Sequence, residues 1–175
     1  MNYRQARAYL DSLDFRGMRL GLQNTEKLLS KLGDPHTKFP IAHVAGTNGK
    51  GSTSTMLANI LAKAGMKTGL YVSPHLETFR ERILINGEMI GRGEAAELVA
   101  ETQAAAETGD GMPVTYFEFM TAMAFLHFSK CGVDAAVVEV GMGGRFDSTN
   151  VVDPALSIIT SVAMDHRQHF TVRRN

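Results

Sequence analysis

The spacing of apolar residues predicts that helices and strands alternate along most of the chain. Near the N-terminus, apolar positions recur at helical intervals from Asn2 to just before Gly17, and again over residues 22–32. Two short apolar runs, residues 41–45 and 67–72, are expected to be strands. The helix predicted between these strands carries its apolar face on Met56, Leu57, Ile60 and Leu61. A strand–helix–strand order of this kind is typical of α/β proteins with a parallel sheet.

The second half of the chain continues the alternation and adds a hairpin. The dipeptide Asn86-Gly87 favours tight hairpin turns, and alternating residues on both sides of it predict two strands within residues 81–90. We expect this hairpin to project from the sheet. The remaining predicted elements are helices over residues 93–108 and 115–130, and buried strands over residues 135–140 and 156–160.

A glycine-rich turn joins the first predicted strand to the helix that follows it. Its residues are Gly46, Thr47, Asn48, Gly49, Lys50, Gly51 and Ser52. In such a loop, backbone N–H groups, the positive end of the helix dipole and a lysine together favour a polyphosphate. The strict phosphate-loop pattern is not met, because Gly46 lies three residues before Gly49 and Gly51 follows Lys50 directly. A plain turn with an exposed lysine is the alternative interpretation.

Composition and charge exclude several classes of partner. The chain has 175 residues, enough for one domain, and its 18 basic residues balance its 18 acidic residues, so neither nucleic acid nor an anionic membrane is expected. Arg4 and Arg7 lie where a signal sequence would be apolar, and no apolar run approaches the roughly 20 residues of a membrane span. The single cysteine, Cys131, cannot form an internal disulfide, so we expect a cytoplasmic protein in which Cys131 is a small buried residue.

Glu139 interrupts an apolar strand, and burial of its charge is costly unless a partner compensates. A salt bridge, for example to Arg145, is one interpretation. The other is a magnesium ion shared with nucleotide phosphates, since Mg²⁺ is usually held by one or two carboxylates together with phosphate and water oxygens. Ser73, His75 and His166 each follow a predicted strand, and the carboxyl ends of parallel strands meet at one edge of a sheet.

The helix predicted over residues 115–130 has polar residues with ordinary structural roles. Thr115 and Glu118 have the spacing of a capping box at its start. His127 shares a face with Met120, Met123 and Ala124, so we expect it to pack in the core.

Several motifs between Leu20 and His166 occur in the order of one known family. They are R-L-G-L-x-N, A-G-T-N-G-K-G-S, Y-V-S-P-H-L, E-R-I-x-I-N-G, T-Y-F-E-F, V-E-V-G-M-G-G-R-F-D-S-T-N and M-D-H. In these motifs the chain resembles the folylpolyglutamate synthase and dihydrofolate synthase branch of the Mur ligase superfamily. The resemblance implies a P-loop NTPase-like α/β domain, with a mainly parallel sheet flanked by helices, that uses ATP and Mg²⁺.

The resemblance also implies roles for individual residues. Nucleotide phosphates would bind to Thr47, Asn48, Gly49 and Lys50, within the loop Gly46–Ser52, and magnesium would bind to Ser73, Glu139 and His166. A dihydropteroate or folate pocket would be bordered by Thr115, Tyr116, Phe117, Glu118, Phe146, Asp147 and Ser148. Lys50, Glu139 and His166 would then serve catalysis.

The implied reaction forms an amide in two steps. The carboxylate of dihydropteroate or a folate attacks the γ-phosphate of ATP to give an acyl phosphate, and the amine of L-glutamate then displaces phosphate. By resemblance, the full-length enzyme is expected to act as a monomer. A small P-loop kinase and a non-catalytic nucleotide or folate binder are the alternative functions.

The resemblance ends after His166. Family members continue with a lysine that is carbamylated and with a C-terminal α/β domain, and neither follows in this sequence. We therefore expect residues 1–169 to be an incomplete ATP-binding domain and residues 170–175 to be an aberrant tail, produced by a frameshift, a premature stop or a deliberate truncation. The prediction is that this chain lacks ligase turnover.

Overall fold

The computed structural model of the protein describes residues 1–14, 21–109 and 111–163. Within this part of the chain, six strands form one sheet in the order β4-β3-β2-β5-β1-β6. The parallel strands are β2 (Thr68–Tyr71), β5 (Ala135–Glu139), β1 (Ile41–Ala45) and β6 (Leu156–Ile159). The antiparallel strands are β3 (Ile83–Ile85) and β4 (Glu88–Met89). The prediction of a mainly parallel α/β sheet is confirmed.

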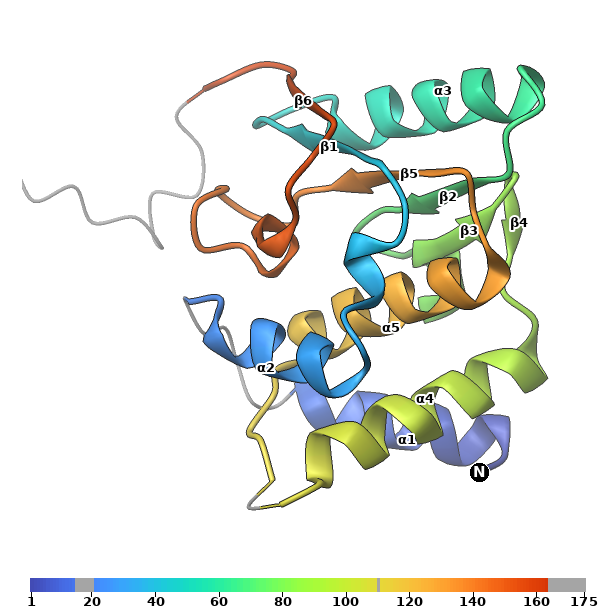
Figure 1. Ribbon diagram of the computed structural model, residues 1–175, viewed down its shortest axis with the longest axis vertical. Coiled ribbons are helices and arrows are strands. Elements are labelled where there is room, and N and C mark those ends of the chain that lie inside the picture. The colour runs from blue at the N-terminus through green and yellow to red at the C-terminus, as the bar shows by residue number, and fades with distance from the viewer. Residues whose placement is uncertain (15–20, 110, 164–175) are drawn as a thin grey trace, which may run out of the picture.

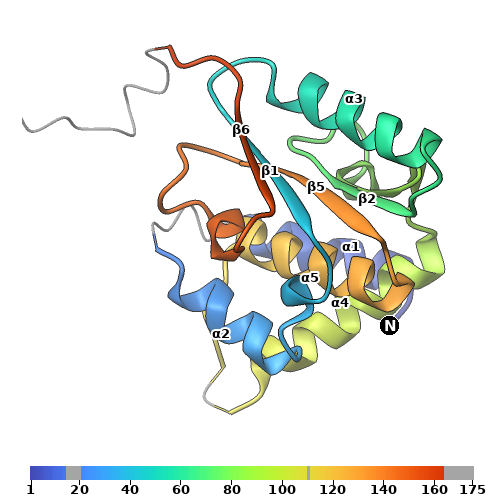
Figure 2. The same cartoon turned by 45° about the horizontal axis from the view of Figure 1, so that its top comes forward.

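Helices cover both faces of the sheet, as Figures 1 and 2 show. One face carries α3 (Lys50–Lys63), and the other carries α5 (Tyr116–Cys131). Beyond α5 lie α1 (Tyr3–Asp14) and α4 (Arg92–Glu107), with α2 (Gln23–Lys31) beside them. Short 3₁₀ turns complete the described elements: η1 (Pro35–Thr37), η2 (Phe79–Arg82) and η3 (Ser148–Val151).

The core lies mainly between the sheet and α5. This helix buries all its side chains from Glu118 to Phe128, because strands cover one side of it and α1, α2 and α4 cover the other. A smaller apolar cluster lies under α3, where Val44, Leu70 and Val137 of three adjacent strands meet Ala58. Since both faces of β5 are covered, this strand is buried throughout, as its apolar run predicts.

The ends of α1 and α5 are set by residues that the sequence singles out. Asn2 accepts a hydrogen bond from the backbone N–H of Gln5 at 2.9 Å. At the start of α5, the Thr115 hydroxyl accepts from the Glu118 N–H at 3.3 Å, and the Glu118 carboxylate accepts from the Thr115 N–H at 2.6 Å. The capping box is confirmed.

The buried face of α3 agrees with expectation only in part, because Leu57 and Leu61 pack against the cluster beneath the helix whereas Met56 and Ile60 are exposed. Met56 and Ile60 are 59% and 64% exposed, whereas Ser54 and Ala58 are buried. The small side chains of Ser54 and Ala58, four residues apart on one face, let the helix approach the strands closely. The spacing of apolar residues predicted burial of Met56 and Ile60, because such spacing carries no information about how closely a helix approaches the strands.

The hairpin and the last strand also differ from expectation. The hairpin forms around Asn86 and Gly87, both with positive φ, but it does not project. It extends the sheet, because β3 pairs with β2 from Gly69 opposite Ile85 to Tyr71 opposite Ile83. The strand predicted over residues 156–160 was expected to be buried. Within the described part of the chain β6 is an edge strand and its side chains are largely exposed.

Candidate functional site

The candidate site forms where the parallel strands end. β1 leads into the glycine-rich turn, β2 into Ser73, and β5 ends at Glu139. In the sheet, β5 lies between β1 and β2, so Glu139 is placed between the turn and Ser73. The expectation that these residues share one edge follows from the parallel order and is met.

The glycine-rich turn has a backbone that demands glycine. Gly46 has a φ of 135°, and a Cβ built there would lie 2.1 Å from the Thr160 hydroxyl oxygen. Gly49, with a φ of 82°, is the N-cap of α3. The backbone N–H groups of Lys50, Gly51 and Ser52 have no acceptor within the helix, whereas the next N–H, that of Thr53, donates to the Gly49 carbonyl oxygen at 2.9 Å.

Lys50 folds back across this turn. Its Nζ atom donates to the carbonyl oxygens of Gly46 at 2.9 Å and of Thr47 at 3.2 Å. The side chain is half-buried, so the plain-turn interpretation with an exposed lysine does not describe it. An ammonium group held inside a ring of backbone groups beside a helix N-terminus is an arrangement suited to anions.

The segment after β6 holds the turn in place. The Thr47 N–H donates to the Ser161 carbonyl oxygen at 2.6 Å, and the Asn48 N–H donates to the Ser161 hydroxyl at 3.3 Å. The Thr160 hydroxyl donates to the Asn48 carbonyl oxygen at 2.8 Å. The backbone N–H groups of Thr47 and Asn48 are therefore already hydrogen bonded, which leaves the first turn of α3 to offer donors to a ligand.

A cavity of about 320 Å³ opens beside the turn. It lies between Lys50, the glycines of the loop after β5 and the segment after β6, and its lining is Ala45, Gly46, Thr47, Lys50, Gly141, Met142, Gly143, Ile159, Val162 and Ala163. This volume is at the lower end of the range for small-molecule sites. The lysine and the backbone amides give it a positive, hydrogen-bonding wall.

Glu139 is 4% exposed, and one of its oxygens accepts from the Ser73 N–H at 2.9 Å. Burial raises the pKa of this carboxyl group, although the Ser73 N–H, Lys50 and Arg82 act in the opposite direction. Within the described residues Glu139 forms no ion pair with Arg145, whose side chain is exposed. Among the described residues, no basic side chain forms the ion pair that the salt-bridge interpretation requires.

The carboxylate faces the start of α3. A Cβ placed on Gly51 would lie 3.6 Å from both Glu139 oxygens, so the glycine leaves open the space between the helix end and the carboxylate. Carboxylate and hydroxyl oxygens are ligands that suit Mg²⁺, and Glu139 and Ser73 are adjacent. His166 and the rest of the M-D-H motif lie outside the described residues.

Two of the residues predicted for a pterin pocket, Phe117 and Asp147, meet at Gly141. A Cβ built on this glycine would lie 2.4 Å from the Phe117 ring and 3.0 Å from an Asp147 carboxylate oxygen. Thr115 and Glu118 are buried in the capping box, Ser148 is buried, Tyr116 is half-buried and Phe146 is 53% exposed. The two predicted halves of the pocket are thus brought together.

Asp147 fixes the loop after β5. Its carboxylate accepts from the N–H groups of Met142 at 2.8 Å and Thr149 at 3.0 Å, and from the Thr149 hydroxyl at 2.6 Å. That hydroxyl is 2.8 Å from Nε2 of His43. Since the Thr149 proton is donated to Asp147, His43 must donate through Nε2. Burial lowers the pKa of His43, while Asp147 acts to raise it.

Sequence reasoning missed three contributors to the site. Thr160 and Ser161 hold the glycine-rich turn, and their position directly after a predicted strand was the available signal. Arg82 donates to Nδ1 of His75 at 2.8 Å and lies 5.2 Å from the centre of the Tyr116 ring. It was placed in a hairpin strand, and nothing in the spacing directs it to the site.

The chain is similar to known proteins along most of its length. The model of the Mur ligase middle domain matches residues 44–175. The chain is 44% identical over 169 residues to the dihydrofolate synthase/folylpolyglutamate synthase of Bacillus subtilis, a match that covers 94% of this chain and 39% of the relative. The chain spans between 20% and 40% of the length of the curated relatives that it matches first.

Solved structures share the fold. An FPGS–AMPPCP–folate complex superimposes with a TM-score of 0.88 at 40% identity, over 96% of this chain and 42% of that chain. Escherichia coli FolC in complex with DHPP and ADP gives a TM-score of 0.87 at 35% identity, over 97% of this chain and 40% of that chain. No described helix has the length and apolar character needed to cross a membrane.

Proposed function

Because the chain belongs to the Mur ligase family, we propose that it is the ATP-binding portion of a ligase that joins L-glutamate to dihydropteroate or a folate. The observation that carries this proposal is the placement of Lys50, the open N-terminus of α3 and the buried Glu139 around one space. The similar FPGS and FolC structures hold AMPPCP with folate, and ADP with DHPP. Their ligands fit the chemistry of this site.

Lys50 and the first N–H groups of α3 bind the ATP phosphates in this proposal. Charge spreads over the oxygens of a transferring phosphoryl group, so positioned cations and amides supply most of the stabilisation. Lys50 would exchange its two carbonyl partners for phosphate oxygens. An ammonium–phosphate contact is stronger than a bond to a neutral carbonyl.

Magnesium would be held by Glu139 and Ser73, with His166 as the third predicted ligand. The raised pKa of Glu139 and the lack of an ion pair to it among the described residues support this, since a cation would relieve the cost of its buried charge. A bound magnesium ion would neutralise charge on the phosphate oxygens. Without it, Glu139 still orients the turn after β2 through the Ser73 N–H.

The acceptor would bind between the start of α5 and the loop after β5. Tyr116 and Phe117 offer ring surfaces there, and Asp147 holds the loop in place. The acceptor carboxylate oxygen would bond to the γ-phosphorus of ATP as the bond to ADP breaks. The glutamate nitrogen would then bond to the carboxyl carbon, phosphate would leave, and the amine would lose a proton.

We propose further that these 175 residues on their own bind nucleotide without completing glutamate transfer. The curated relatives are between two and five times as long as this chain, which covers 20% to 40% of their length. A displacement of reacting groups by about 1 Å can cost a hundredfold in rate. A site open to water would also hydrolyse an acyl phosphate. The binding-only alternative is therefore the function proposed for this chain by itself.

Product analysis tests these proposals. Purified protein is incubated with Mg-ATP, L-glutamate and either dihydropteroate or tetrahydrofolate, and products are identified by mass spectrometry. We expect no glutamylated pterin above a Lys50→Ala control. Glutamylated product would establish the ligase and contradict the binding-only proposal, whereas a stable phosphorylated metabolite other than the acyl phosphate of the pterin would establish a kinase and contradict the ligase.

A further inference from the structure

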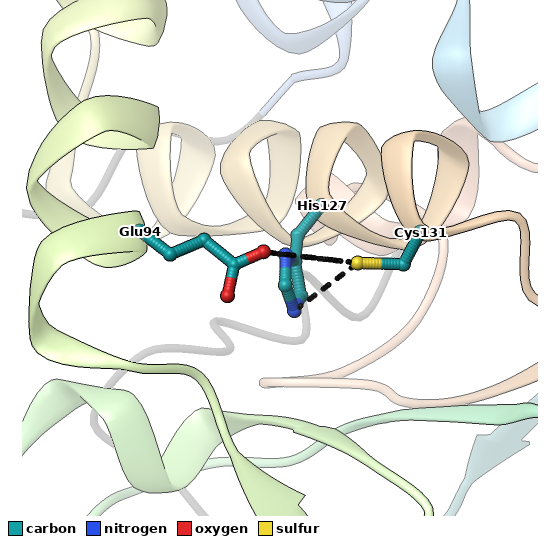
Figure 3. Close-up of side chains that lie close together, drawn as sticks. All are labelled: Glu94, His127 and Cys131. Atoms are coloured by element: carbon teal, nitrogen blue, oxygen red, sulfur yellow. Dashed lines mark hydrogen bonds and ion pairs between the residues drawn. The ribbon is translucent and has the colours of Figure 1, made fainter.

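Three potential metal ligands lie close together where α4 packs against α5, away from the candidate site. They are Glu94 in the first turn of α4, and His127 and Cys131 in α5. Figure 3 shows the Glu94 side chain reaching from its helix toward the imidazole and the thiol. His127 and Cys131 are four residues apart and so share one face of α5. The function proposed above uses none of them.

We propose that Glu94, His127 and Cys131 form a binding site for a single zinc ion. Carboxylate, imidazole and thiolate are the ligand types that zinc takes in proteins, and three of them with a water complete a tetrahedron. Separate helices supply them, so the ion would join the start of α4 to the end of α5.

The distances between the ligand atoms fit this geometry. Cys131 Sγ is 3.8 Å from Glu94 Oε1 and 3.7 Å from His127 Nδ1, and the latter two atoms are 3.3 Å apart. Zinc bond lengths of about 2.3 Å to sulfur and about 2.0–2.1 Å to nitrogen and oxygen, at tetrahedral angles, place sulfur about 3.6 Å from either atom and nitrogen about 3.3–3.4 Å from oxygen. The backbone therefore already holds the three ligands at suitable separations.

One side chain must turn to accept the ion. Cys131 Sγ is almost equally far from the two ring nitrogens of His127, 3.7 and 4.0 Å, so Nδ1 does not yet direct its lone pair between the other ligands. Rotation about the bond from Cβ to the ring corrects this, and that torsion has a broad energy profile.

The local charges are compatible with a divalent cation. Glu94 and a Cys131 thiolate together carry two negative charges, which balance Zn²⁺. Burial and Glu94 raise the pKa of the Cys131 thiol, so zinc would bind with release of its proton. The nearby Lys67 ammonium opposes a second cation, but its Nζ donates to the Cys131 carbonyl oxygen at 2.5 Å and not to a ligand atom.

The position of the cluster separates it from the candidate nucleotide site. Cys131 and Glu139 lie at opposite ends of β5: Cys131 comes shortly before its first residue, Ala135, and Glu139 is its last residue. The strand rises about 3.3 Å per residue, which separates the two ends by about 13 Å. Zinc at this cluster would thus stabilise the packing of α4 on α5 without touching the nucleotide.

Titration with zinc alone tests the proposal. Affinity for Zn²⁺ is measured by competition with a chromophoric chelator in the parent protein, Cys131→Ser and Glu94→Gln, with Glu97→Gln as the matched control. Glu97 is an exposed carboxylate on the same helix and outside the cluster. We expect the parent protein to bind a single zinc ion. Zinc affinity should fall about tenfold to a hundredfold or more in Cys131→Ser and Glu94→Gln, because loss of even a residue that hydrogen bonds to a metal ligand lowers affinity about 10–100-fold. The Glu97→Gln control should bind zinc as tightly as the parent.

Cobalt and thiol chemistry give independent readouts on the parent protein. Co²⁺ should produce a thiolate charge-transfer band that Cys131→Ser lacks. Zinc should also slow alkylation of Cys131, a test that needs no variant to fold. Equal zinc affinity in parent and Cys131→Ser, absence of the cobalt band, or unchanged alkylation would each overturn the proposal.

Discussion

Replacing Glu139 by glutamine should separate a metal-site carboxylate from a structural ion pair. This carboxylate is 4% exposed, and Ser73 supplies its one described hydrogen bond. Glutamine keeps nearly the same shape and its amide oxygen can still accept that bond, but it removes the buried charge. We expect the metal-free variant to be as stable as the parent or more stable at neutral pH.

The size of the gain follows from the raised pKa. Each unit by which folding raises the pKa of a carboxyl group costs the charged form about 1.4 kcal/mol. The folded protein then binds the proton more tightly than the unfolded chain, so stability falls as pH rises through the interval between the ordinary and the raised pKa. The advantage of Glu139→Gln should therefore shrink as pH is lowered toward the ordinary pKa of the carboxyl group.

Urea unfolding in the presence of a chelator measures this difference, with Glu97→Gln as a surface control for the loss of charge. The same variant should bind nucleotide with a weaker dependence on magnesium. A loss of several kcal/mol in the metal-free protein, with magnesium dependence intact, would refute the reasoning, because breaking a buried ion pair typically costs about 3–5 kcal/mol.

Two further predictions concern the surroundings of the site. Gly141→Ala should lower the free energy of unfolding by about 1–3 kcal/mol and weaken folate binding, because its Cβ would lie 2.4 Å from the Phe117 ring. In the control Gly144→Ala, the added Cβ meets nothing within 4 Å, so neither property should change. Equal denaturation midpoints for the two variants would contradict the close packing at Gly141. The lowered pKa of His43 means that the unfolded chain binds its proton more readily, so stability should fall as pH drops below about 6.5. His43→Gln should flatten that dependence in urea titrations, and an unchanged slope would show that His43 does not contribute.

Local sequence rules predicted most elements because these elements obey local chemistry. The capping box at Thr115, the turn at Asn86 and the apolar run of β5 each depend on neighbours in the chain. The predicted burial of Met56 and Ile60 in α3 was wrong, because the buried face depends on how closely a helix approaches a sheet. The hairpin was placed outside the sheet because strand order is not encoded in the spacing of either strand.

The residues of the candidate site also fall into those that local sequence predicts and those that it does not. The glycine-rich turn and Glu139 stand out in the sequence, since glycines at set positions and an acid in an apolar strand are unusual. The role of Ser161 depends on β6 pairing with β1, more than 100 residues earlier in the chain. The Glu94–His127–Cys131 cluster depends on the packing of α4 against α5, and the sequence led us to expect core packing for His127.

Nucleotide affinity of Lys50→Ala tests the central claim most directly. Lys50 is a basic group beside the open end of α3, and a hydrogen bond to a charged group contributes about 1.5–3 kcal/mol. Calorimetric titration with Mg-ATP should therefore show affinity reduced about tenfold or more in Lys50→Ala, and unchanged in Lys63→Ala, which removes an exposed lysine from the last turn of the same helix. Equal affinity in parent and Lys50→Ala, both folded, would contradict the assignment of this turn as the nucleotide site.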